Sequence, residues 1–178
     1  SGEAFIEREE NYIKQSYRNR CYILSSSGPQ SLSVPVYLGS FHKTPIKDIR
    51  IDYSKRWQQV HLRAIRSAYS SSPYFLFYFE NIENIMLRNH VFLLDLNMDL
   101  LLALLKMLKI ECAVRYTGEY IKPGIAENDF RYSLSPKKDT GYRPEYYQKV
   151  FEYEGINEGR LSIIDLIFSQ GPDSARFL

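Results

Sequence analysis

The residues best suited to chemistry lie in one short run, Lys14-Gln15-Ser16-Tyr17-Arg18-Asn19-Arg20. In an extended strand the cations of this run share one face with a hydroxyl group, because side chains alternate between the two faces. Such a face attracts phosphate or carboxylate, and guanidinium groups grip these anions in a bidentate geometry. We therefore predict an anion-binding site made by Lys14, Tyr17, Arg18, Asn19 and Arg20. The alternative is a solvated strand face whose cations pair with Glu7, Glu9 and Glu10.

His61 is the predicted catalytic residue. It lies on the apolar face of a predicted helix, one turn after Trp57. An imidazole titrates near neutral pH and is the commonest general acid or base in enzymes. Asp48 or Asp52, in the segment before the helix, are the candidates to orient it. The alternative is a hydrogen-bonded histidine of the core.

A polar loop supplies two further candidate ligands. It contains Asn128-Asp129-Phe130-Arg131 and Pro136-Lys137-Lys138. Loops carry binding residues more often than the elements they connect. We predict that Arg131 and Lys137 reach the anionic ligand from this loop, the alternative being a plain solvated loop. The sequence has no zinc-ligand spacing, no P-loop and no GxGxxG run, so no metal and no cofactor is predicted.

The elements that must position these residues are strands followed by helices. Alternating apolar residues predict strands over residues 3–7, 12–24, 32–38, 46–51 and 111–116. The Ser- and Gly-rich turn at 25–29 joins two of them into a β-hairpin. Apolar residues at steps of three and four predict helices over 57–69, 74–87, 92–108, 145–153 and 161–168.

The order of these elements predicts an α/β fold, with a mixed sheet, a β-hairpin extension and several packed helices; α+β is the alternative. A strand reached through a long helix is usually parallel to its partner. Pro35 favours an edge or a bulge in the second hairpin strand. Ser162 and Asp165 read as a capping pair at the start of the last helix, which Gly171 and Pro172 end.

Composition bounds the class of protein. The 178 residues, 44% apolar and 25% charged, fit one domain over residues 1–178. A net charge of +2 argues against a dedicated nucleic-acid binder. The two cysteines, Cys21 and Cys112, lie in apolar surroundings and read as free thiols, which indicates a reducing, cytoplasmic location. The N-terminus has no signal-peptide pattern, and the apolar stretch 92–108 is too short and too interrupted to cross a membrane.

Three ordered stretches resemble the WbqC-like family of bacterial proteins. They run from Glu10 to Cys21 with the strand around Val34, from Ile46 to Tyr53 leading to Trp57 and His61, and from Tyr146 to Pro172. Family members usually begin with an extra strand and helix, so we expect this chain to lack that piece. Arg160 and Ser169 stand where asparagines are expected. The family has no established activity, and the presence of some members in O-antigen gene clusters implies a role in surface-polysaccharide or nucleotide-sugar biosynthesis.

Three functional hypotheses remain at the level of the sequence. The leading one is a protein that binds an anionic small molecule, such as a nucleotide-sugar, and conceivably transfers a group to an activated sugar. In the second, a non-catalytic binding or scaffold module docks an acidic partner on the same basic run. The third and weaker one is RNA binding, because arginine and tyrosine can hold phosphates and stack on bases. Neither the motifs nor the composition indicate an oligomeric state.

Overall fold

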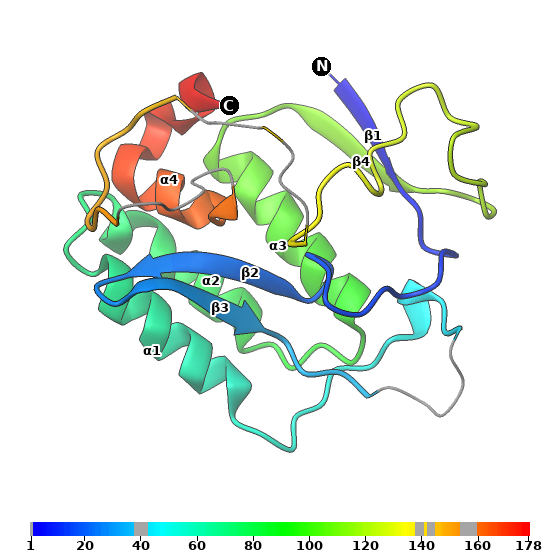
Figure 1. Cartoon of the computed structure of the whole chain (residues 1–178), viewed down its shortest axis with the longest axis horizontal. Coiled ribbons are helices and arrows are strands. Elements are labelled where there is room, and N and C mark those ends of the chain that lie inside the picture. The colour runs from blue at the N-terminus through cyan, green and yellow to red at the C-terminus, as the bar shows by residue number, and fades with distance from the viewer. Residues whose placement is uncertain (1, 38–42, 138–140, 142–144, 154–159) are drawn as a thin grey trace.

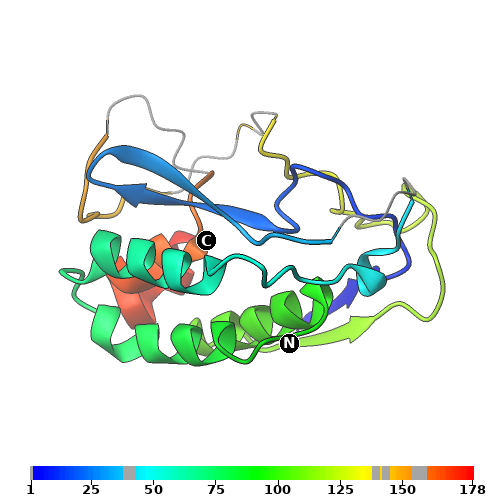
Figure 2. The same cartoon turned by 90° about the horizontal axis from the view of Figure 1, so that it is seen from below.

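A computed structural model describes residues 2–37, 43–137, 141, 145–153 and 160–178 of the chain. Its helices are α1 (Trp57–Tyr69), α2 (Phe75–Met86), α3 (Leu93–Met107) and α4 (Ile163–Gln170). Its strands are β1 (Gly2–Ile6), β2 (Arg20–Ser25), β3 (Gly28–Ser33) and β4 (Cys112–Tyr116). The β2–β3 hairpin lies over α1 and the other helices lie beneath, with β1 and β4 at one end (Figures 1 and 2). Helices together with parallel and antiparallel strands confirm the predicted class.

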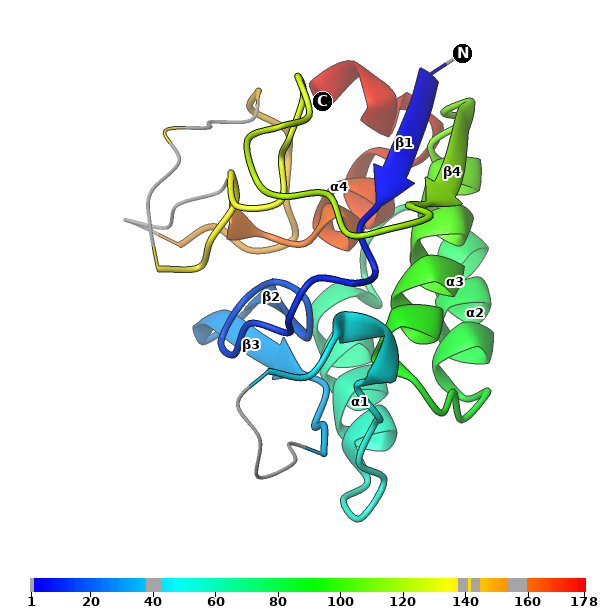
Figure 3. The same cartoon turned by 90° about the vertical axis from the view of Figure 1, so that its right-hand side faces the viewer.

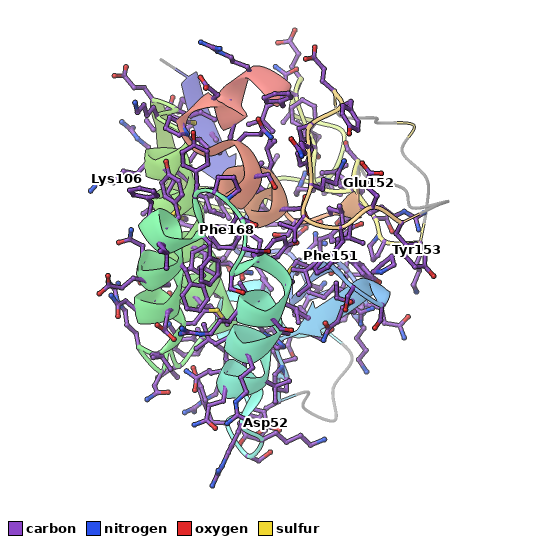
Figure 4. The ribbon with its side chains drawn as sticks, turned by 90° about the vertical axis from the view of Figure 1, so that its left-hand side faces the viewer. Asp52, Lys106, Phe151, Glu152, Tyr153 and Phe168 are labelled. Atoms are coloured by element: carbon purple, nitrogen blue, oxygen red, sulfur yellow. The ribbon has the colours of Figure 1, made fainter. Side chains whose placement is uncertain are left out.

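The helices follow the apolar spacing that predicted them. In α1 the buried side chains recur at helical steps, at Trp57, His61, Leu62, Ile65, Ala68 and Tyr69. In α4, Gly171 ends the helix with a φ of 56°. A Cβ atom at Gly171 would come within 2.4 Å of the Tyr74 ring, so only glycine fits there. Phe168 is fully buried among the helices, whereas Asp52 and Lys106 lie at the outer edge of the view (Figure 4).

The predicted hairpin is confirmed, but its strands have other bounds. β3 covers Gly28–Ser33, so within the described part of the strand predicted over 32–38 only residues 32 and 33 are strand. Ser25 pairs with Gly28, so a two-residue loop connects β2 and β3. Gly28 has a φ of 98°, and a Cβ there would lie 2.9 Å from the Tyr153 ring, which is seen beside the hairpin in Figure 4. Before Arg20 the chain turns, with Gln15 at a φ of 57°. The predicted strand over 12–19 is therefore wrong, and the expected shared face from Lys14 to Arg20 does not form.

The strand pairing divides the strands into two small sheets. β2 and β3 are antiparallel, and β1 pairs with β4 in parallel, Gly2 opposite Cys112 and Ile6 opposite Tyr116. The hairpin and helices α1–α3 intervene in the chain between the two parallel strands, which is the long connection that parallel pairing requires. Within the described residues, each sheet has two strands.

Two further element predictions are wrong. Residues 46–51 contain a short 3₁₀ helix, Ile46–Asp48, and two isolated bridges in place of a strand. Ile46, Ile49 and Ile51 are all buried there, a spacing that an alternating strand cannot produce. Residues 145–153 form no helix, and Tyr147 is anchored in the core through its hydroxyl group instead.

Some predictions fall partly outside the described residues. These are the end of the strand predicted to Leu38 and Lys138 of the predicted polar loop. Over residues 118–137 the chain has turns but neither helix nor strand, so the described residues of the predicted polar loop do lie in a loop.

Candidate functional site

A cavity of about 190 Å³ lies between the hairpin, α1, α2 and α3, and we call it the hairpin cavity. Apolar side chains form its walls, among them Leu32, Val34, Ile65, Met86 and Leu104. Polar side chains from three separate segments also line it, namely Tyr17, Arg18, Asn19, Arg20, Asn97 and Ser162. His61 and Trp57 of α1 complete the lining. Five of the predicted site residues, Tyr17, Arg18, Asn19, Arg20 and His61, therefore share one cavity.

Three side chains of the hairpin cavity carry buried polar atoms without a hydrogen-bond partner among the described residues. They are the carbonyl oxygen Oδ1 of Asn19, the Nε of Arg20 and the indole Nε1 of Trp57. Asn19 is held in place because its Nδ2 donates to the backbone carbonyl of Val34 at 2.9 Å. A buried polar group left unpaired costs roughly 1–3 kcal/mol. One acceptor and two donors without a partner among the described residues thus belong to side chains that line one small space.

His61 is a buried, neutral imidazole. Its side chain is 7% exposed, and its ring meets the Trp57 ring edge-on with centroids 5.2 Å apart. Burial lowers the pKa of His61 to about 4. A hydrogen bond to the backbone of Ser33 raises the pKa, but this effect is the smaller of the two. The carboxylate of Asp52 instead accepts the backbone N–H of Ser54 at 2.8 Å. Within the described part of the chain, neither Asp48 nor Asp52 contacts the His61 ring.

Arg18 is already paired with a carboxylate. Its guanidinium donates to Glu10 Oε1 from both Nε, at 2.8 Å, and Nη2. The Glu10 side chain is 7% exposed and that of Arg18 is 18% exposed, so the pair is largely shielded from water. The Arg18 guanidinium also lies 5.8 Å from the centre of the Tyr132 ring. Arg18 therefore offers less positive charge to a ligand than Arg20 does.

The remaining predicted residues do not line the hairpin cavity. Lys14 and Lys137 are exposed. Arg131 bonds to Asp129 and donates from Nη1 to the Ile121 carbonyl at 2.7 Å. It lines a larger cavity of about 780 Å³ beside β1, which shares Tyr17 and Arg18 with the hairpin cavity. The expected convergence of Arg131 and Lys137 on one ligand is therefore not formed by the described residues.

Sequence reasoning missed two polar residues of this site. The side chain of Asn97 donates from Nδ2 to the backbone carbonyl of Arg18 at 2.8 Å, which ties α3 to the turn before β2. The signal was weak, because Asn97 is one of several polar residues in this helix and lies between Asp95 and Asp99. Ser162 hydrogen-bonds to the Cys21 thiol, yet burial still raises the pKa of Cys21 to about 11. Nothing in the sequence pattern links Ser162 to Cys21.

Comparison with known proteins defines the class. The WbqC-like protein family matches residues 3–135. This range contains the hairpin, α1 to α3 and the lining residues of both cavities, except Ser162 and Ile164 of the hairpin cavity. This chain belongs to the WbqC-like protein family.

A relative in Mycobacterium tuberculosis, the uncharacterised protein Rv1507c, is 27% identical over 203 residues, covering 99% of this chain and 87% of the relative. No solved structure matches the chain. In the part of the chain that the structure describes, helices are too short or too polar to cross a membrane.

Proposed function

We propose that the hairpin cavity binds a small anionic molecule through Arg20, Asn19 and Trp57. The observation that carries this proposal is the set of buried polar atoms without a partner among the described residues, two donors and one acceptor, on three residues that line one cavity. A phosphate or carboxylate accepts hydrogen bonds from Arg20 Nε and Trp57 Nε1, and a hydroxyl group of the same ligand donates to Asn19 Oδ1. Arg20 carries the charge recognition because Arg18 is paired with Glu10.

The volume of the cavity limits the ligand. Clefts for drug-sized ligands span about 300–1,000 Å³, whereas the hairpin cavity holds about 190 Å³. A single sugar ring with its phosphate suits this space, and the nucleoside part of a nucleotide-sugar would extend past Tyr17 and Arg18. The ligand class agrees with the role in surface-polysaccharide or nucleotide-sugar biosynthesis that the family resemblance implies.

Binding is tested by calorimetry with a sugar 1-phosphate, a nucleoside diphosphate sugar and inorganic phosphate. Arg20→Gln is expected to weaken binding of the phosphorylated sugars roughly 10- to 100-fold, because a charge-assisted hydrogen bond contributes about 1.5–3 kcal/mol. Lys14→Gln is the matched control, since it removes the same charge from an exposed side chain of the same segment. It should leave binding unchanged.

Two results would contradict the proposal. One is the absence of binding by any of the three probes to the folded wild-type protein. The other is equal weakening by Arg20→Gln and Lys14→Gln, which would indicate general charge attraction. Should Arg20→Gln fail to fold, Arg20→Lys keeps the charge while removing Nε, and it should still weaken binding.

His61 separates the enzymatic version of this function from the non-catalytic one. In the enzymatic version, a hydroxyl or amino group of the activated sugar attacks a donor molecule, and the donor's carrier departs as the transferred group bonds to the sugar. The neutral His61 ring accepts the proton of the attacking group. His61→Gln should then abolish turnover while the phosphorylated sugar still binds. A protein that binds the sugar without turnover is instead the binding module. Binding of RNA would appear as an affinity that falls steeply with salt.

A further inference from the structure

The larger cavity is a groove along the unpaired edge of β1. It is lined by the consecutive residues Glu3 to Glu7 on one side and by residues 121–134 on the other. Figure 3 shows the segment after β4 passing below β1 and rising on the side of β1 away from β4. We call this space, of about 780 Å³, the edge groove.

The backbone of β1 offers hydrogen bonds to this groove. Gly2 donates its N–H to Glu111, and Ile6 accepts from the N–H of Thr117, so both point their backbone groups toward β4. Backbone groups alternate in direction along a strand, which directs those of Glu3 and Phe5 the opposite way. Among the described residues, neither Glu3 nor Phe5 makes a backbone hydrogen bond on that side. An open strand edge of this kind is a template for another strand.

Charge and apolar surface in the edge groove point to one kind of partner. Its lining has five carboxylates, from Glu3, Glu7, Glu10, Glu127 and Asp129, against the two guanidiniums of Arg18 and Arg131. Arg18 pairs with Glu10, Arg131 pairs with Asp129 and Glu7, and Arg115, outside the lining, pairs with Glu3. The five carboxylates still outnumber these three guanidiniums, which leaves an excess of negative charge.

Phe5, Phe130 and Leu134 also line the groove and are 57%, 73% and 62% exposed. Apolar side chains of this size are normally covered when they gather in one place.

We propose that the edge groove binds an extended, positively charged segment of another protein, which adds to β1 as a third strand. Backbone hydrogen bonds to Glu3 and Phe5 supply the affinity, in the mode known as β-augmentation. Apolar residues of the segment cover Phe5 and Phe130, and its lysines or arginines lie near the exposed Glu127. The groove is separate from the proposed ligand site, although the two meet at Tyr17 and Arg18.

The probe is a fluorescent hexapeptide that alternates lysine and valine, followed by anisotropy. Its comparison peptides are an alternating glutamate and valine peptide and a lysine–valine peptide with alternate backbone nitrogens methylated. The lysine–valine peptide should bind, and the other two should bind at least roughly tenfold more weakly, equal to about 1.4 kcal/mol. Equal binding of the methylated peptide would overturn strand addition, and equal binding of the glutamate peptide would overturn the charge argument.

A pair of variants locates the site. Glu127→Lys reverses a charge on the exposed rim of the groove and should weaken the lysine–valine peptide roughly fivefold. Glu119→Lys makes the same change at an exposed residue outside the groove lining and should not. Equal effects of both variants would overturn the assignment. Concentration-dependent dimerisation in sedimentation, lost on adding the peptide, would instead assign the groove to a second copy of this chain.

Discussion

At the scale of the residue, burial decides what His61 can do. The imidazole is buried against Trp57 and away from any carboxylate in the described structure, so its charged form is disfavoured. It is therefore neutral at physiological pH and is available as a hydrogen-bonding group or as a weak base. Neighbouring Arg20 differs, because a guanidinium keeps its charge when buried and instead demands partners for its donors.

The pH dependence of stability tests this state of His61. The pKa of His61 is lowered in the folded protein to about 4, so the unfolded chain binds the proton first and stability falls as pH drops from about 6.5 towards 4. Urea unfolding at pH 7 and pH 5 should show about 2 kcal/mol more loss for the wild type than for His61→Gln. Carboxylates such as Glu7 contribute mainly below this window, and they do so equally in both proteins. Identical pH profiles would mean that His61 is not buried as described.

At the scale of the element, two glycines fix how the hairpin and the last helix pack. Gly28 and Gly171 both have positive φ and both lie directly against a tyrosine ring. The tyrosines come from other segments, Tyr153 before α4 and Tyr74 before α2. The backbone at the start of β3 and at the end of α4 therefore lies directly against a tyrosine ring from elsewhere in the chain.

Gly171→Ala tests this dependence. At a φ of 56° and a ψ of −123° a side chain is strained, and its Cβ would overlap the Tyr74 ring. The free energy of unfolding should fall by about 3 kcal/mol. Gly118→Ala is the control, since a Cβ there meets nothing within 4 Å, and it should change stability by less than about 0.5 kcal/mol. Similar effects of the two substitutions in urea unfolding would refute the packing argument.

At the scale of the whole molecule, one buried carboxylate joins distant parts of the chain. Asp165 of α4 accepts hydrogen bonds from the hydroxyl groups of Tyr69 and Tyr147, each at 2.8 Å. Tyr69 in turn accepts the backbone N–H of Leu24 in β2. Asp165 is 1% exposed, so its predicted role in capping the helix with Ser162 is wrong, and Ser162 makes no side-chain cap bond. Burial raises the pKa of the Tyr69 hydroxyl, which stays protonated and able to donate.

Asp165→Asn should destabilise the whole fold. The amide keeps one acceptor oxygen and turns the other position into a donor facing a tyrosine hydroxyl, which leaves buried groups mismatched. We expect a loss of about 2–3 kcal/mol in urea unfolding. Asp173→Asn, at an exposed residue of the C-terminal 3₁₀ helix Gly171–Phe177, is the matched control and should be neutral. An unchanged stability in Asp165→Asn would contradict the role of the carboxylate as the acceptor of both hydroxyl groups.

The sequence alone determined the elements whose signal is local. Apolar spacing marked α1 to α4, and the Ser25–Gly28 turn marked the hairpin, because such patterns depend on neighbours a few residues apart. Tertiary structure decided where the functional groups point. A strand was predicted from Lys14 to Arg20, but the chain turns there and Arg18 pairs with Glu10. Asp165 was predicted to cap a helix, but it accepts hydrogen bonds from tyrosine hydroxyl groups. These contacts join segments far apart in the chain, so burial and pairing across the fold override what each segment favours by itself.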